Sequence, residues 1–483
     1  MHFPDNPGFT GINEPHRAEI DIIDLEVDGE IPADINGAFY RVQPDFIYPP
    51  RFDNDVPFNG DGHVSMFRIQ NGHVDYKSRY AQTQRYKAQK AARKALFGTY
   101  RNRDTDDPSV RHLSGGTANT NLIYHAGKLF AMKEDSPPVQ MDPNTLETLD
   151  DYYTFNGKME AQTFSAHPKI CPVTGEMFTL CYEAKGNASR DVAFYSFDKS
   201  GQVNWQAWIE VPYAGMLHDF VVTQTYIAFL VIPMAVNVEQ MQRGGVHYAW
   251  DSSLPTYFGV LARGGDGTDL RWYKGPERCA THVMNGFADG TKLYVDMDMA
   301  ESNQFPFFPM LNGQFNPKKA EGRLTRLSVD LSKNEETYTQ EILYPHSGVL
   351  PKTDERYWGL PYKVGFMPVV DPSKPVDGTF ISPTGLIMNT WVRFDHNVGK
   401  ATNFWVGDDA STLQEPQFIP RRDGAEEGDG YLIGLCNRHS DRHTDLLILD
   451  TQHLDEGPIA TAKLPFALRN GVHGMWLDES HLA

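Results

Sequence analysis

The sequence has few cysteines, little positive charge and no long apolar run. The four cysteines, Cys171, Cys181, Cys279 and Cys436, lack the paired spacing of a metal site, so we expect free buried thiols in a reducing compartment. No run of about 18 apolar residues occurs, so no transmembrane helix and no integral membrane contact are expected. The first ten residues lack a basic region followed by an apolar core, which predicts no signal peptide and a cytoplasmic location.

Negative charge and turn-forming residues dominate what is present. The 44 Lys and Arg stand against 63 Asp and Glu, a net charge of −19, which argues against nucleic acid as a partner. With 41 Gly and 32 Pro, the chain is rich in turns, as β-proteins are. Short strands separated by turn signals are predicted at 64–69, 74–80, 122–124, 129–132, 177–180, 192–197, 220–222, 226–231, 292–296 and 445–449. Such a series is typical of a β-propeller, although no sequence repeat gives the number of blades.

The chain is interpreted as a single domain, 1–483, because no linker interrupts the pattern. Segments near 85–112, 234–258 and 300–319 are expected to be insertions that form a cap, and the last two are expected to contain no strand. Within the first, Arg85 to Phe97 predicts a helix, either a solvated surface helix or a lid. The third is rich in phenylalanine, and its Phe305 lies either in a packed loop or in the apolar wall of a substrate site.

Four isolated histidines lie beside apolar or β-type runs: His167, His218, His282 and His473. Gly471 and Gly474 flank the last of them, and glycines let the backbone approach closely and leave a neighbouring ring free to point at a ligand. Their wide spacing differs from that of zinc fingers. Each histidine alone is more simply a structural or surface residue, but together they form a candidate metal-ligand set.

These segments resemble the carotenoid cleavage oxygenase family over almost the whole chain. Gly37 to Arg41 is similar to that family's early glycine, aromatic and arginine segment, and Asn59 to His63 contains its G-D-G turn. The four histidine segments match its iron-ligand segments in order. The resemblance implies an all-β fold, a seven-bladed β-propeller with a helical and loop cap over the active-site face. It also implies a non-haem Fe(II) held by the four histidines and O₂-dependent cleavage of a carbon–carbon double bond.

The family also places glutamates where they hold the second ring N–H of the ligands. Glu134 and Glu415 match two such positions, and Glu427 is a further candidate. A third family glutamate precedes an apolar residue, a proline and a basic residue. Here that segment reads Val349 to Lys352, so Val349 occupies the acidic position, unless the loop is aligned differently.

Three residues resemble the lignostilbene dioxygenase branch: Phe58 before the G-D-G turn, Tyr100 in a G-T-Y-R-N segment, and Lys133 before Glu134. A lysine in an apolar tunnel is costly unless a polar ligand group meets it. Tyr100 and Lys133 are therefore predicted to be catalytic and to hydrogen-bond a substrate 4-hydroxyl, with Phe58 stacking on an aryl ring. The alternatives are a salt bridge from Lys133 to Glu134 or its neighbour, and ordinary packing for Phe58.

The preferred hypothesis is a dioxygenase that splits the central double bond of 4-hydroxystilbenes into two aromatic aldehydes. Its partners are then a small phenolic stilbene and O₂. The second hypothesis is an apocarotenoid-cleaving oxygenase with the same iron site. The third is a propeller without catalytic activity that acts as an interaction scaffold, which holds no stoichiometric iron.

Overall fold

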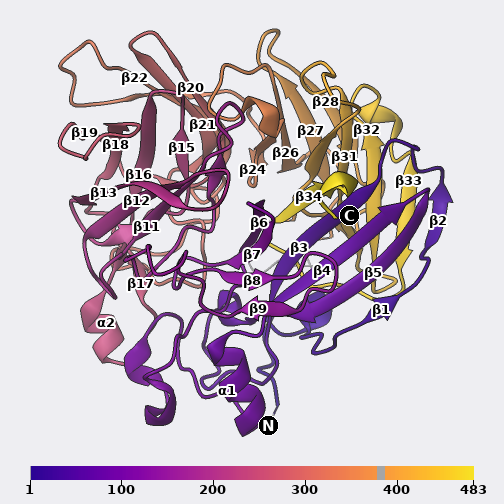
Figure 1. Cartoon of the computed structure of the whole chain (residues 1–483), viewed down its shortest axis with the longest axis horizontal. Coiled ribbons are helices and arrows are strands. Elements are labelled where there is room, and N and C mark those ends of the chain that lie inside the picture. Colours follow the sequence, from indigo (N-terminus) through magenta and orange to yellow (C-terminus); the bar gives the residue numbers. More distant parts are fainter. Residues whose placement is uncertain (1, 378–386, 483) are drawn as a thin grey trace. The chain divides into compact units, whose positions relative to one another are not determined.

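The computed structural model describes residues 2–377 and 387–482, in which strands predominate (Figure 1). The chain divides into two compact units. The first comprises Met1–Lys133, Pro138–Tyr152 and Val364–Ala483, and the second comprises Glu134–Pro137 and Tyr153–Lys363.

The described residues of the first unit form four antiparallel sheets. One has the order β1 (Asp21–Ile22), β5 (His73–Tyr80), β4 (Asp61–Gln70), β3 (Gly37–Asp45) and β34 (Gly474–Asp478). Another contains β6 (Asn121–His125), β7 (Lys128–Met132), β8 (Val139–Met141) and β9 (Thr148–Asp150). A third includes β26 (Val364–Val370), β27 (Thr390–Asp395) and β28 (Lys400–Trp405). The fourth has the order β2 (Glu26–Gly29), β33 (Ala460–Leu464), β32 (His443–Asp450), β31 (Gly430–Arg438) and β29 (Ser411–Leu413), and β30 (Gln417–Pro420) also pairs with β31.

Three antiparallel sheets are found in the second unit. The first contains β10 (Lys169–Ile170), β11 (Met177–Tyr182), β12 (Asp191–Phe197) and β13 (Val203–Glu210). The next contains β14 (Gly215–Met216), β16 (Tyr226–Val236), β18 (Thr256–Ala262) and β19 (Arg271–Gly275), with β15 (Phe220–Val222) and β17 (Tyr248–Trp250) paired to β16. The last contains β20 (Cys279–Asp289), β21 (Lys292–Ala300), β22 (Arg323–Asp330) and β23 (Thr339–Ile342). Two short strands follow, β24 (Ser347–Gly348) and β25 (Lys352–Thr353).

A strand from the end of the chain completes the sheet formed by its beginning. β34 pairs with β3, from Gly37 opposite Asp478 to Arg41 opposite Gly474, and the yellow and indigo strands lie side by side in Figure 1. Apolar side chains of this sheet and of the β31–β33 sheet pack in one core, which includes Phe39 and Ile433. The pairing fixes the backbone at the start of β34, where His473 precedes the strand.

Several sequence predictions agree with the strands in detail. The segment 74–80 lies within β5, and 220–222 coincides with β15. Asn71 and Gly72 connect β4 to β5 as expected, and both have positive φ, 52° and 83°, as a two-residue hairpin turn requires. All four cysteines are free and buried.

Three local predictions were wrong. The helix expected at Arg85 to Phe97 is α1 (Gln84–Ala92), which is shorter because Arg93 takes a left-handed φ of 54° and ends it. The segment 234–258, expected to contain no strand, includes the end of β16, the helix α2 (Val238–Gln242) and β17. The G-D-G segment is only partly a turn, since β4 begins at Asp61.

The interpretation of the chain as one domain, and the role of its insertions as a cap, stay predictions. Within residues 2–377 and 387–482, no helix combines the length and the apolar character needed to cross a membrane.

Candidate active site

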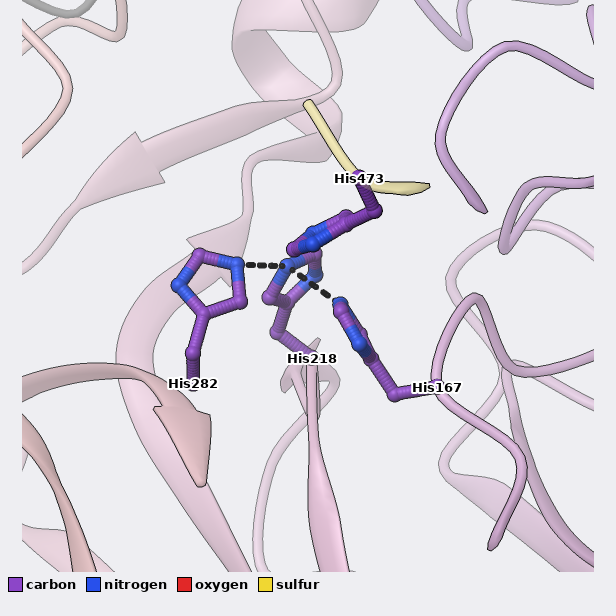
Figure 2. Close-up of side chains that lie close together, drawn as sticks. All are labelled: His167, His218, His282 and His473. Atoms are coloured by element: carbon purple, nitrogen blue, oxygen red, sulfur yellow. Dashed lines mark hydrogen bonds between the residues drawn. The ribbon is translucent and has the colours of Figure 1, made fainter. Parts of the chain in front are cut away.

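Three histidines converge within the second unit. His167 lies just before β10, His218 lies between β14 and β15, and His282 lies inside β20. The Nε2 atom of His218 is 3.1 Å from Nε2 of His167 and 3.1 Å from Nε2 of His282. The rings are steeply inclined to one another, with interplanar angles of 72–77°, as Figure 2 shows. The cluster therefore presents three ring nitrogens toward a common point.

The position of His282 depends on an irregularity in its strand. The pairing of β20 with β21 shifts register between Ala280 and Val283 and again after Val283. A shift of this kind leaves residues out of the ladder and re-aims their side chains. The sequence indicated only that each histidine lies beside an apolar or β-type run, whereas His282 lies at a bulge inside the long strand β20.

Proton positions on two of the rings follow from their outer contacts. The Nδ1 atom of His218 is 2.5 Å from Oε1 of Glu134, so Nδ1 carries the proton and donates it to the carboxylate. The Thr281 hydroxyl donates to Asp298 at 2.6 Å and lies 3.0 Å from Nδ1 of His282, so it accepts from that ring. Both rings thus present an Nε2 lone pair inward.

Two inward lone pairs 3.1 Å apart repel unless a proton or a metal ion lies between them. Imidazole nitrogens bind first-row metals at about 2.1 Å, so two ligands at right angles to each other lie about 3.0 Å apart. The observed Nε2 spacing matches this value. Neutral imidazoles also suit Fe, Zn, Cu or Ni better than they suit Mg or Ca. The donor set therefore fits a transition metal.

Buried carboxylates give the histidine cluster of the second unit a negative environment. Burial lowers the pKa of His218, but the charges of Glu134, Asp219 and Asp298 outweigh burial and raise that pKa overall. Burial raises the pKa of Asp298 to about 6, opposed by hydrogen bonds from Thr281 and from the backbone of His282. These anions favour a cation at the cluster.

His473 belongs to the first unit, where a single carboxylate contacts both its ring and the backbone amide of the next residue. Its Nδ1 lies 2.8 Å from Oε1 of Glu415, and the backbone N–H of Gly474 donates to Oε2 of the same residue at 2.9 Å. His473 is only 3 % exposed. Its ring orientation is therefore fixed by one carboxylate that contacts both the ring and the next amide.

The glycines around His473 have the role that the sequence indicated. A Cβ on Gly474 would lie 2.5 Å from the backbone oxygen of Tyr40, and one on Gly471 would lie 1.7 Å from Nη2 of Arg41. Arg41 itself is buried and donates to the side chain of Gln414 at 2.6 Å. Close packing of β3 against this segment thus requires both glycines.

Three of the four predicted substrate residues, Phe58, Tyr100 and Lys133, belong to the first unit. The Lys133 ammonium, in a side chain 3 % exposed, donates to the backbone oxygen of Phe58 at 3.1 Å and to Oδ1 of Asn119 at 3.2 Å. It also lies 5.0 Å from the centre of the Tyr100 ring, within range of a cation–π contact. The lysine is therefore held between the phenylalanine backbone and the tyrosine ring.

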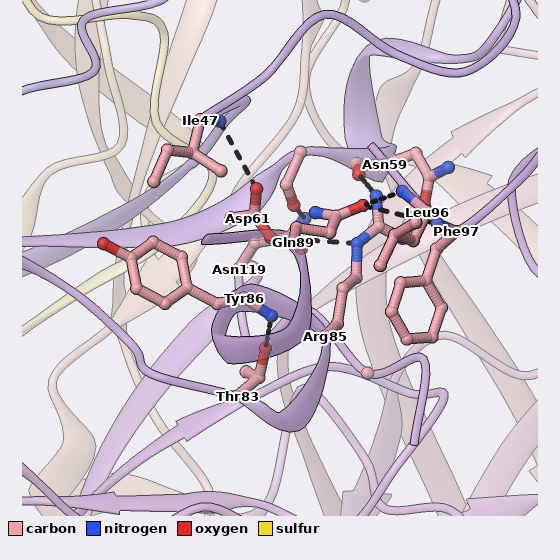
Figure 3. A network of polar contacts seen from close by, with 12 residues as sticks. Ile47, Asn59, Asp61, Thr83, Arg85, Tyr86, Gln89, Leu96, Phe97 and Asn119 are labelled. Carbon is pink, nitrogen blue, oxygen red and sulfur yellow. Dashed lines mark hydrogen bonds and ion pairs between the residues drawn. The ribbon is translucent and has the colours of Figure 1, made fainter. Parts of the chain in front are cut away.

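A buried polar network that the sequence did not indicate supports these residues. Arg85 of α1 donates to Oδ1 and to the backbone oxygen of Asn59, at 2.9 and 2.7 Å; Figure 3 shows this arginine turned toward Asn59. Asn59 in turn donates to Asp55 at 2.5 Å, and Asp55 accepts the backbone N–H of Tyr100 at 3.0 Å. Burial raises the pKa of Asp55 to about 6. Arg85 is thus buried, not solvated as one interpretation of the helix had it.

The last two predicted site residues have mainly structural contacts. Glu427 accepts the backbone N–H of Val364 at 2.8 Å, which anchors the start of β26. Phe305 lies in the loop after β21, where its ring centre is 5.8 Å from that of Phe307 and 5.9 Å from that of Phe308. A role for Glu427 beside a ligand and for Phe305 in a substrate wall stays a prediction.

Comparison with known proteins finds full-length similarity. Residues 13–478 match the family model described as RPE65, retinal pigment epithelial membrane protein. The chain is 45 % identical to lignostilbene-alpha,beta-dioxygenase isozyme III of Sphingomonas paucimobilis, covering 100 % of this chain and 99 % of that protein. It is 40 % identical to isoeugenol monooxygenase of Pseudomonas nitroreducens, covering 98 % of each.

Among solved structures, the crystal structure of Pseudomonas brassicacearum lignostilbene dioxygenase superposes with a TM-score of 0.94 at 38 % identity, covering 99 % of this chain and 100 % of that one. The prediction of a seven-bladed β-propeller is confirmed. The chain belongs to the RPE65, or carotenoid cleavage oxygenase, family.

Proposed function

We propose that this protein is an Fe(II)-dependent dioxygenase that cleaves the central double bond of 4-hydroxystilbenes into two aromatic aldehydes. The observation that carries the proposal is the buried Lys133 ammonium beside the Tyr100 ring, in a chain 45 % identical to a lignostilbene dioxygenase. In an apolar substrate site, a phenolic oxygen is an acceptor that matches such a buried ammonium.

The proposed metal ligands are His167, His218, His282 and His473, the candidate ligand set that Figure 2 draws. Four neutral imidazoles leave the ion its full charge. Glu134 keeps the ring of His218 in one tautomer, and Glu415 does so for the ring of His473. When bound, the iron supplies the site at which O₂ is activated. The protein's own contribution is to hold these rings in the metal-binding orientation.

Substrate recognition is assigned to Tyr100 and Lys133, which hydrogen-bond the 4-hydroxyl, and to Phe58, which stacks on the aryl ring. The nearby ammonium lowers the pKa of the substrate phenol. Phenolate character then moves electron density along the conjugated system into the alkene, which prepares it for oxidation. The residues of the first unit thus act on the substrate through its hydroxyl group.

A second candidate substrate is isoeugenol, because the chain is 40 % identical to an isoeugenol monooxygenase. Isoeugenol shares the 4-hydroxyaryl alkene but lacks the second ring. The same lysine and tyrosine serve either compound, so recognition of the hydroxyl does not separate the two.

The test is aerobic incubation of the Fe(II)-loaded protein with a 4-hydroxystilbene, its 4-methoxy analogue, isoeugenol and an apocarotenal, with products identified by mass. Two aromatic aldehydes from the hydroxystilbene, and little product from the methoxy analogue, support the proposal. Preferential turnover of isoeugenol or of the apocarotenal assigns the enzyme to that substrate instead. Absence of stoichiometric iron supports the scaffold hypothesis.

A further inference from the structure

His282 is a predicted metal ligand that lies at a bulge of β20. A metal-ligating ring holds its orientation when its other ring N–H donates to an acceptor. The structure offers one within the same sheet. Asp298 of β21 is fully buried, with 0 % exposure, and lies opposite the bulge that contains His282.

Both oxygens of Asp298 are directed at the bulge. Oδ1 accepts the backbone N–H of His282 at 2.5 Å, and Oδ2 accepts the Thr281 hydroxyl at 2.6 Å. Oδ1 lies 3.7 Å from Nδ1 of His282, too far for a direct hydrogen bond. The carboxylate therefore contacts the histidine's backbone directly and its ring only through another group.

Thr281 provides that group. Its single hydroxyl proton is donated to Asp298, so at 3.0 Å from Nδ1 of His282 the oxygen accepts the proton of the ring. The chain of donors runs in one direction, from imidazole to hydroxyl to carboxylate. Its effect is to leave the lone pair of His282 on Nε2, the atom that faces His218.

The bulge explains why this arrangement is possible. Thr281 and His282 fall between the paired residues Ala280 and Val283, so their amides are available to side chains. The next amide, that of Val283, donates to Oδ2 of Asp219 at 2.8 Å. Buried carboxylates thus replace the missing ladder partners on both sides of the ligand.

We propose that Thr281 and Asp298 are the positioning residues of His282. Thr281 fixes the ring tautomer, and Asp298 fixes both the threonine hydroxyl and the ligand backbone. The inference rests on the metal site of the proposed function but not on the identity of the substrate.

The experiment compares Thr281→Val, which keeps the shape of the side chain and removes the hydroxyl, with Thr281→Ser, which keeps the hydroxyl. Each full-length protein is loaded with Fe(II), and the rate of iron transfer to a chelator is followed by absorbance. Loss of an outer-shell partner typically weakens metal binding about 10- to 100-fold. We expect iron release at least about 10-fold faster from Thr281→Val, and a rate from Thr281→Ser close to that of the wild type.

A second readout is the absorption spectrum of the Co(II)-loaded proteins, which reports ligand geometry without turnover. We expect a changed spectrum for Thr281→Val and an unchanged one for Thr281→Ser. Equal release rates and spectra for all three proteins overturn the inference, as does equal damage by both substitutions. Failure of the wild type to bind one metal per chain overturns the proposed function instead, so the two failures are distinguishable.

Discussion

Replacing Lys133 by methionine is the most direct test of phenol recognition. The substitution keeps an unbranched side chain and removes the ammonium. A hydrogen bond that involves a charged group contributes about 1.5–3 kcal/mol. Since about 1.4 kcal/mol corresponds to a factor of ten, we expect kcat/KM on a 4-hydroxystilbene to fall about 10- to 150-fold.

The structure indicates that this variant folds. The backbone oxygen of Phe58, which loses the lysine, still accepts from Nδ2 of Asn119 at 2.8 Å. Oδ1 of Asn119, the other acceptor, still receives the Thr120 hydroxyl at 2.9 Å. Neither oxygen is left unsatisfied, so the expected loss of stability is only about 1 kcal/mol, and iron content is expected to be unchanged.

The assay measures aldehyde formation from a 4-hydroxystilbene and from its 4-methoxy analogue, with wild type, Lys133→Met and a control, Lys128→Met. Lys128 is the first residue of β7, the strand that Lys133 directly follows, and it is not among the predicted substrate residues. The predicted loss is confined to the hydroxylated substrate and to Lys133→Met. Undiminished turnover of the hydroxystilbene, or an equal loss on both substrates, refutes phenol recognition by this lysine.

Three further substitutions or treatments follow from the same contacts. Glu415→Gln leaves one acceptor oxygen for two donors, the ring of His473 and the backbone N–H of Gly474. We therefore expect iron binding to weaken about 10-fold, measured as iron per chain after dialysis. Full retention of iron contradicts a role for Glu415. Arg85→Met removes the donor to two oxygens of Asn59, so we expect the free energy of unfolding, measured with urea, to fall by about 3 kcal/mol. Arg93→Met, at the exposed C-terminal end of the same helix, is the control and is expected to leave that free energy unchanged. Burial raises the pKa of the Cys171 thiol, but hydrogen bonds outweigh burial and bring the pKa to about 7. We therefore expect the rate of Cys171 alkylation, followed by mass spectrometry, to rise as the pH passes 7. A pH profile without a midpoint near 7 excludes this assignment.

The parts of the fold that the sequence predicted depend on local patterns. The hairpin at Asn71 and Gly72 follows from backbone conformations that those two residues tolerate. The strand 74–80 follows from the alternation of side chains across one sheet. The four histidines were identified because each lies in a short segment with a recognisable neighbour, such as the glycines beside His473. None of these required knowledge of a distant contact.

The residues that the sequence did not indicate act through distant contacts. Arg85 meets Asn59 across 26 positions, and Asp55 meets the backbone of Tyr100 across 45. A basic residue in a short helix is usually solvated. Arg85 is buried because its side of the helix faces the segment before β4, which contains Asn59. Asp298 lies 16 residues beyond His282, and the bulge that brings them together cannot be read from a regular alternation.

Buried carboxylates at the candidate site share one mode of attachment. Asp298 accepts the backbone N–H of His282, and Glu415 accepts that of the residue after His473. Asp55 accepts the backbone N–H of Tyr100. A carboxylate tied by a charge-assisted bond to the main chain beside the group it orients has little freedom to move away from it. A side-chain substitution leaves the backbone N–H donor in place. If such a carboxylate is replaced by its amide, the new NH₂ group can turn toward that N–H and repel it. We therefore expect this replacement to disturb the site more than removal of a side-chain donor does.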